Sequence, residues 1–179
     1  ATRCTYNGTT NSPVNAGDYA VEAVIDDSMY SGSTTGLFYL AKASPALILA
    51  TPGNQLIISN PVLSATSSCP LDITYSVLEG PAQLNDATLS FTNTGNVTVG
   101  AIQAGDTNWL SATSTVSFTV SKAPATISLS KLSLSYNGAS QQPAVQTTPA
   151  DLPVTLTFNG STSCPVNVGT YAVTGRVNT

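Results

Sequence analysis

A stretch at the N-terminus of this chain recurs near its C-terminus. Residues 1–27 (ATRCTYNGTTNSPVNAGDYAVEAVIDD) align without a gap with residues 153–179 (PVTLTFNGSTSCPVNVGTYAVTGRVNT). Pro13 falls on Pro165, so the offset is 152 residues, and an Asn-Gly pair, a Gly and a Tyr also coincide. A recurrence at a fixed offset with this many identities indicates a repeated structural unit. The C-terminal segment therefore restarts a unit whose second part is already present at the N-terminus.

The composition predicts a fold made of β-strands. Charged residues make up 8% of the chain and hydrophobic residues 41%, while Ser, Thr, Val, Gly and Asn are abundant. Abundant β-branched residues, with Gly and Pro scattered throughout, favour sheet over long helices. The net charge of −4 disfavours a nucleic-acid partner, and no apolar run approaches the roughly 20 residues that membrane insertion needs. Without an initiator Met or a leader, the sequence is expected to be a mature or excised piece.

Short alternating segments between Gly, Pro and Asn turns predict the strands. One example is 19–25, where Tyr19, Val21, Ala23 and Ile25 lie on one face of a half-buried strand. The remaining predicted strands are 3–6, 35–40, 47–50, 56–58, 62–65, 72–78, 88–91, 97–102, 115–120, 125–129, 132–136, 154–158 and 171–177, with 143–145 extended. A spacing of roughly 8–12 residues between such strands is typical of β-sandwiches.

A second internal echo divides the chain into three parts. The segment Asp27-Ser28-Met29-Tyr30 resembles Asp106-Thr107-Asn108-Trp109, and Ala41-Lys42-Ala43 resembles Ser121-Lys122-Ala123. Both pairs stand at the end of a predicted sandwich, where we expect the aromatic residue to plug the core. Short Lys-Ala links before a Pro suit domains strung end to end, because Pro limits the hinge. The predicted parts are 1–43, 44–122 and 123–179, of which only the middle one has a full set of strands.

The outer parts resemble the MBG-type repeat domain of large bacterial surface proteins. In residues 124–179 the motifs that carry the resemblance, with the linker before them, are Lys122-Ala123, Ser135-Tyr136-Asn137-Gly138, Leu152-Pro153-Val154, Phe158-Asn159-Gly160 and Val168-Gly169-Thr170-Tyr171. Residues 1–43 resemble the second half of the same domain through Tyr6-Asn7-Gly8, Asn15-Ala16-Gly17-Asp18-Tyr19 and Ala41-Lys42-Ala43. Residues 44–122 resemble the bacterial Ig-like domains that alternate with it. The resemblance implies an all-β fold of tandem Ig-like β-sandwiches of Greek-key type, arranged end to end, in a secreted or cell-surface protein.

The residues offer little to catalysis. With no histidine the usual general base is absent, so we expect no enzyme, no cofactor and no zinc site. The adjacent acids Asp26 and Asp27 fit a solvated turn or, as the alternative, a calcium-binding loop.

Cysteines and sequons supply the candidate modification sites. Cys4, Cys69 and Cys164 are disulfide candidates. An extracellular location favours at least one bridge, between units or between chains. The sequons at Asn7, Asn96 and Asn159 are possible glycosylation sites.

Two functions remain open. The first is a rod, stalk or filament whose partner is the chain itself, either in a covalent tandem array or through strand complementation between copies. In the second case residues 28–43, with Tyr30, Leu37 and Tyr39, would donate a strand to the unfinished C-terminal unit, because exposed sheet edges pair readily. The alternative is an adhesin that binds a surface glycan or a protein, with Trp109, Tyr30 and Tyr75 as a stacking platform.

Overall fold

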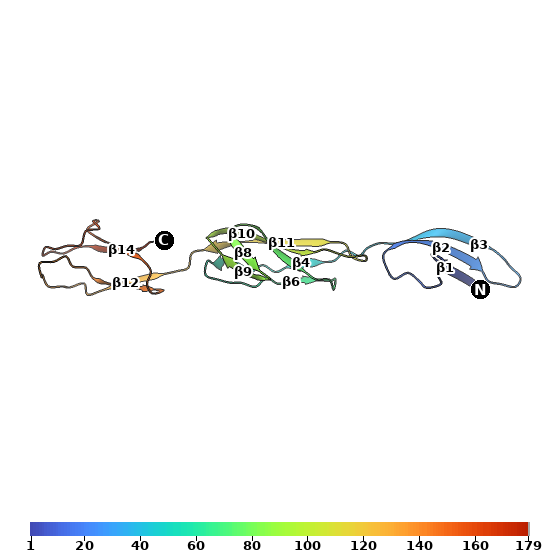
Figure 1. The fold of residues 1–179 in the computed structure, drawn as a ribbon, viewed down its shortest axis with the longest axis horizontal. Coiled ribbons are helices and arrows are strands. Elements are labelled where there is room, and N and C mark those ends of the chain that lie inside the picture. The colour runs from blue at the N-terminus through green and yellow to red at the C-terminus, as the bar shows by residue number, and fades with distance from the viewer. Residues whose placement is uncertain (179) are drawn as a thin grey trace. The chain divides into compact units, whose positions relative to one another are not determined.

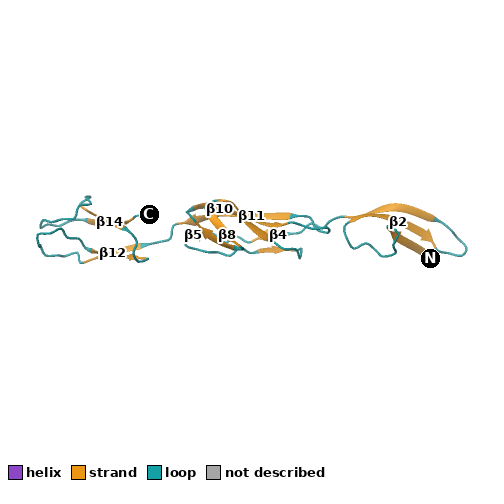
Figure 2. Ribbon diagram, in the orientation of Figure 1, coloured by secondary structure: helices purple, strands orange, loops and turns teal. Residues whose placement is uncertain are grey.

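All the regular structure in residues 1–178 is β-strand. These are the residues that the computed structural model describes. Figure 2 shows strands and loops and no helix in this part of the chain, which confirms the all-β prediction. The chain separates into two compact units, the first covering Ala1–Lys122 and the second starting at Ala123.

The first unit opens with a single antiparallel sheet, blue in Figure 1. Its strands lie in the order β1 (Thr2–Tyr6), β2 (Gly17–Ile25) and β3 (Ser33–Leu40). Tyr6, Tyr19 and Phe38 gather on one face, with ring centroids 6.3 Å apart for Tyr6 and Phe38 and 6.4 Å apart for Tyr19 and Phe38. No residue of β3 is fully buried, because no second sheet covers this face in the described structure.

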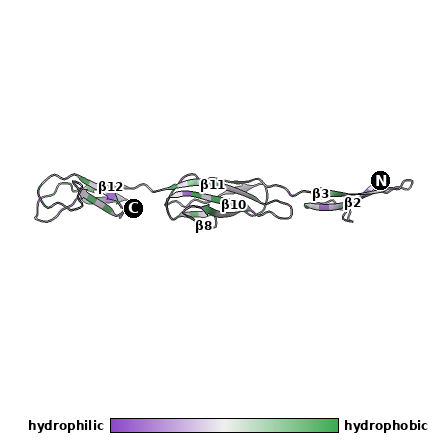
Figure 3. Ribbon diagram, turned by 90° about the horizontal axis from the view of Figure 1, so that it is seen from above, coloured by the Kyte–Doolittle hydropathy of each residue, from purple (hydrophilic) through white to green (hydrophobic). Residues whose placement is uncertain are grey.

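The rest of the first unit is a sandwich-like arrangement with its own core. Its strands are β4 (Leu47–Leu49), β5 (Gln55–Leu56), β6 (Ala65–Ser67), β7 (Thr74–Glu79), β8 (Ala82–Asn85), β9 (Thr88–Phe91), β10 (Gly95–Gln103) and β11 (Ala112–Ser121). A four-stranded sheet has the order β5-β11-β10-β7, and β4-β6 and β8-β9 form two further pairs. Side chains of the sheet and of the pairs meet in one core of Leu49, Leu63, Leu89, Val97, Val99, Ala101, Phe118 and Val120. Along β11, buried hydrophobic residues alternate with exposed polar ones, as the colours of Figure 3 show.

The second unit contains two antiparallel strand pairs. One joins β12 (Thr126–Ser130) to β13 (Ala144–Thr148), and the other joins β14 (Val154–Phe158) to β15 (Val173–Val177). The pairs approach each other closely, since a Cβ added at Gly175 of β15 would lie 3.4 Å from Ile127 Cγ2 of β12. Phe158 is buried between them.

Three details of the strand prediction are wrong. Residues 132–136 alternate like a strand but belong to none, because no neighbouring segment pairs with them in the described structure. The prediction missed β8, whose four residues follow directly after the Gly80-Pro81 turn. The strand expected at 62–65 lies later, at 65–67, because the chain first bonds to β9 through Val62 and then turns to pair with β4.

Candidate functional site

The pair β14–β15 reproduces the pair β1–β2. In the first sheet the register runs from Thr2 opposite Ile25 to Tyr6 opposite Val21. In the second unit it runs from Val154 opposite Val177 to Phe158 opposite Val173, which is the same register shifted by the repeat offset. The sequence repeat is therefore a repeat of backbone pairing as well.

The two pairs differ in what lies beside them. In the first sheet β3 pairs along the other edge of β2, with Leu40 opposite Gly17, Phe38 opposite Tyr19 and Ser33 opposite Val24. Within residues 1–178 no strand pairs with the corresponding edge of β15. An unpaired edge presents a row of N–H and C=O groups that can accept another strand. This edge is the candidate site.

An apolar pocket of about 390 Å³ opens beside this edge. Phe158 and Tyr171 line it, and the repeat offset equates them with Tyr6 and Tyr19, the two rings that contact Phe38 in the first sheet. The exposed segment 132–136 supplies the opposite wall through Leu132, Leu134 and Tyr136. The pocket therefore lies where the repeat relationship places the side chain of Phe38.

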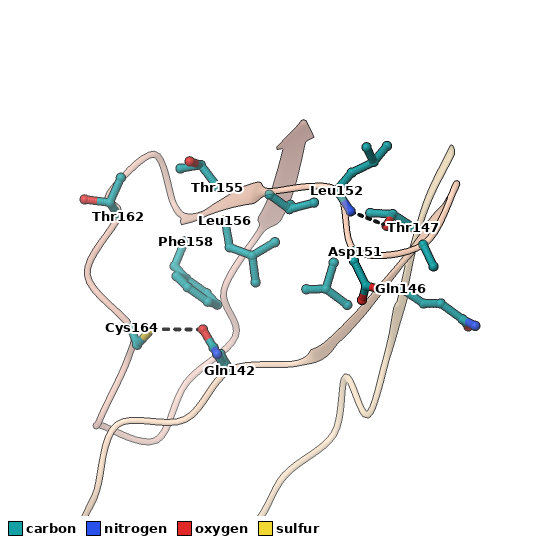
Figure 4. A pocket seen from close by; sticks show the side chains of 13 residues that line it. Gln142, Gln146, Thr147, Asp151, Leu152, Thr155, Leu156, Phe158, Thr162 and Cys164 are labelled. Atoms are coloured by element: carbon teal, nitrogen blue, oxygen red, sulfur yellow. Dashed lines mark hydrogen bonds between the residues drawn. The ribbon is translucent and has the colours of Figure 1, made fainter. Parts of the chain in front are cut away.

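A larger cavity of about 760 Å³ lies between β13 and β14 (Figure 4). Cys164 Sγ donates a weak hydrogen bond to Gln142 Oε1 over 3.6 Å, and the Leu152 amide donates to Thr147 Oγ1 over 3.2 Å. In the chain that the structure describes, no group of three or more His, Cys, Asp or Glu side chains could hold a metal ion. This cavity offers a thiol and amides but no activating base, since the chain has no histidine.

The junction between residues 1–43 and 44–122 is held by hydrogen bonds from one turn. The Ala43 amide donates to Asn108 O over 2.8 Å, and the Leu110 amide donates to Ala43 O over 2.9 Å. The Asn108 side chain accepts from the Ala16 amide over 2.8 Å and donates to Asn15 Oδ1 over 3.0 Å. Asn108 thus binds both the linker and the turn before β2, a role that its sequence context did not indicate.

The structure does not gather the three aromatics of the predicted adhesin platform. Trp109 is half-buried at the junction, where its backbone bridges to Ala43. Tyr75 packs against the core, and its hydroxyl accepts a hydrogen bond from the Ala65 amide over 3.0 Å. Only Tyr30 is exposed.

The strand-donor residues divide between the two faces of β3. Leu37 and Tyr39 are exposed on the face opposite to Tyr19 and Val21. Phe38 lies on the same face as Tyr19, so it is the β3 side chain that can contact a core. The sequence prediction missed Phe38, although the alternation from Tyr19 to Ala23 could have indicated it once the register was known.

The three cysteines are free thiols within the single chain. Cys69 is buried, Cys4 is exposed and Cys164 is half-buried. No disulfide joins described residues, and pairing between chains stays a prediction.

The predicted sequons and the acidic pair have structural roles in turns or sheets. Asn7 and Asn159 each accept a backbone hydrogen bond through Oδ1, and Asn96 Oδ1 accepts from Thr119 Oγ1 over 3.2 Å. Asp27 Oδ1 accepts from the Met29 and Tyr30 amides within its own turn. Glycosylation remains a prediction at all three asparagines.

These features define a class: an all-β repeat protein that carries two incomplete pieces of the same domain around a middle sandwich. The model of the MBG domain family matches residues 1–44 and 125–179, which together are more than half of the chain. The chain therefore belongs to the MBG domain family, a repeat family of surface proteins, as the sequence resemblance predicted. No curated protein matches the sequence. Within residues 1–178 there is no helix with the length and apolar character to cross a bilayer.

Proposed function

We propose that this protein is an extracellular structural repeat protein that builds a rod, stalk or filament from β-sandwich domains placed end to end. In this proposal residues 44–122 form a complete Ig-like sandwich of Greek-key type, which acts as a spacer, and strand addition joins one copy of the chain to the next. The observation that carries the proposal is the free edge of β15, which repeats β2 without the strand that β2 has beside it.

The occupant we propose for this edge is β3 of a second copy. The register of β2 with β3, shifted by the repeat offset, places Phe38 opposite Tyr171 and Ser33 opposite Arg176. Strand parity then directs Phe38 into the pocket beside Phe158 and Tyr171. Main-chain hydrogen bonds would supply affinity, and the filled pocket would supply specificity.

Exchange between copies requires β3 to leave β2 of its own chain. The hydrogen bonds on the two edges are equivalent, because the registers are the same. The difference lies in Phe38, which is 43% exposed against β2 because no second sheet covers it there. Against β15 it would also meet Leu132, Leu134 and Tyr136. Full burial of a Phe side chain is worth about 1.5–3 kcal/mol, so burying its remaining exposed part favours the edge of β15.

Sedimentation velocity of the 179-residue chain over a range of concentrations tests the proposal. We expect linear oligomers for the native chain, weakened about tenfold by Phe38→Ala, because about 1.4 kcal/mol of burial is lost. Leu37→Ala is the matched control, since Leu37 is 86% exposed on the opposite face and its loss leaves association unchanged. A chain that stays monomeric, or equal effects of the two substitutions, would overturn strand addition between copies.

An adhesive module that binds a surface glycan or a protein is the alternative function. It has less support, because Trp109 and Tyr75 are held in the junction and against the core. Quenching of Trp109 fluorescence by a member of a glycan panel would favour it.

A further inference from the structure

Two turns in the first unit have the same sequence pattern and the same internal hydrogen bonds. In one turn Asp106 Oδ1 accepts from the amides of Asn108 and Trp109, both over 2.8 Å. In the other, Asp27 Oδ1 accepts from the amides of Met29 and Tyr30 over 2.9 and 3.3 Å. We name these the Asp106 turn (residues 106–110) and the Asp27 turn (residues 27–31).

The Asp106 turn binds a linker. Ala43 lies beside it in a parallel bridge with Trp109 and exchanges two backbone hydrogen bonds, with Asn108 O and the Leu110 amide. Lys42 Nζ donates to Asp106 O over 2.7 Å. Four hydrogen-bonding groups of the turn and linker are satisfied in this way, and the linker is fixed in an extended conformation.

The Asp27 turn has the same groups without an occupant in the described structure. By position Met29 O corresponds to Asn108 O and the Ser31 amide to the Leu110 amide, and neither forms a hydrogen bond within residues 1–178. Met29 and Tyr30 are 81% and 69% exposed. One other linker in the chain has the matching sequence: Ser121-Lys122-Ala123 repeats the Ala41-Lys42-Ala43 that the Asp106 turn binds.

The linker at Ala123 of the same chain cannot reach this turn. The Asp27 turn joins β2 to β3 at the end of the first sheet opposite to Leu40 and Ala43. From the Asp106 turn, β11 runs away for ten residues, roughly 33 Å, before Ala123 follows. The turn and the linker are therefore separated by the lengths of β3 and β11, and the occupant must come from another copy.

The strand addition proposed above would bring the two together. The start of β12, the end of β13 and the start of β14 lie at one end of the second unit, since Thr126 pairs with Thr148 and Leu152 bonds to Thr147. Val177 lies at the same end, opposite Val154. A donated β3 would place Ser33 opposite Arg176, so the Asp27 turn just before it would arrive next to the segment that precedes Thr126.

We propose that the Asp27 turn of one copy is a docking site for the Lys122–Ala123 linker of a second copy. The Ala123 amide donates to Met29 O, the Ser31 amide donates to Ala123 O, and Ala123 lies beside Tyr30 as Ala43 lies beside Trp109. This inference rests on the proposed function, because the copy that donates β3 also supplies the turn. It makes both junctions of the repeat alike.

Disulfide trapping between two singly substituted chains tests the inference. Both chains carry Cys4→Ser and Cys164→Ser and keep the buried Cys69. One then receives Tyr30→Cys and the other Ala123→Cys, and the mixture is oxidised mildly. We expect a covalent dimer. The double substitution Ala43→Cys with Trp109→Cys in one chain is the positive control, because it reproduces the same bridge within the molecule. A chain with the exposed Val14→Cys in place of Tyr30→Cys is the negative control.

A second cross-link separates this inference from the strand addition beneath it. Thr35→Cys in one chain and Thr174→Cys in the other report the β3–β15 pairing, since Thr35 lies opposite Glu22, the counterpart of Thr174. If this dimer forms and the Tyr30–Ala123 dimer does not, the docking site is wrong and strand addition stands. If neither forms, both are wrong. If only the Tyr30–Ala123 dimer forms, the docking site stands without strand addition.

A matched pair of proline substitutions supplies a readout without cysteines. Ala123→Pro removes the amide that would donate to Met29 O, whereas Ala125→Pro leaves it in place, and each creates a Pro-Pro pair with Pro124. Loss of one hydrogen bond should weaken oligomerisation about fivefold for Ala123→Pro only. Equal sedimentation of the two variants would overturn the docking site.

Discussion

Asn7 and Asn159 occupy the same place in two copies of one turn. Their φ angles are 47° and 48°, each is followed by a Gly with positive φ, and each Oδ1 accepts a hydrogen bond from a backbone amide thirteen residues on, that of Ala20 or Ala172. One side chain thus closes the turn and ties it to the following strand. The Asn-Gly pairs are retained at both ends of the chain because two physical demands, positive φ and a side-chain acceptor, fall on one residue.

Substitutions at Asn159 should separate these two demands. Asn159→Gly removes the acceptor of the Ala172 amide and keeps the positive φ without strain. Asn159→Ala removes the acceptor and also adds about 1–2 kcal/mol for a left-handed L-residue. Hydrogen exchange at the Ala172 amide should accelerate in both variants and accelerate more in the Ala variant. Equal exchange in the two would show that the backbone strain is released elsewhere.

Gly80 is a position where a side chain cannot fit. Its φ is +99°, and an added Cβ would collide with the backbone of Asn96 and lie 2.8 Å from Val97 Cα. Gly80→Ala should therefore lower the unfolding free energy of the first unit by about 3 kcal/mol, from strain and overpacking together. The control is Gly53→Ala, where φ is +71° and the space is open, so only about 1 kcal/mol of strain is expected. Urea titration followed by the fluorescence of Trp109, the one Trp of the chain, measures both.

Asn108 should hold the junction through its side chain. Asn108→Ala removes the acceptor of the Ala16 amide and the donor to Asn15 Oδ1, so the Ala16 amide should exchange about tenfold faster. Asn108→Asp keeps an acceptor and should preserve most of the protection at Ala16. Thr107→Ala, an exposed position in the same turn, is the control and should leave it unchanged. If Asn108→Ala behaves like Thr107→Ala, then the backbone bonds to Ala43 hold the junction alone.

The thiols should differ in reactivity according to burial. In the native chain Cys4 should react at once with a thiol reagent, Cys164 more slowly, and Cys69 only on unfolding. Because no bridge exists within the chain, the predicted disulfide must join chains. Thiol titration of the denatured, unreduced native protein checks it: fewer than three reactive thiols per chain supports a bridge, and three would exclude one.

Several features of this protein follow from its sequence alone. The repeat, the all-β fold and the Asn-Gly turns are encoded locally, since alternation with period two and a residue that tolerates positive φ need no distant partner. The predicted strands at 88–91 and 154–158 have the observed bounds for the same reason. The MBG resemblance rests on such local motifs too.

Pairing was decided only by the tertiary structure. Residues 132–136 alternate as well as any strand, yet they remain unpaired because alternation specifies a face and not a partner. The same limit hid Phe38 behind Leu37 and Tyr39: which face of β3 meets Tyr19 depends on a register set by hydrogen bonds to β2. The free edge of β15 and the unoccupied Asp27 turn emerge only when each is compared with its paired counterpart, because a missing partner is a property of the assembled sheet and leaves no mark in the local sequence.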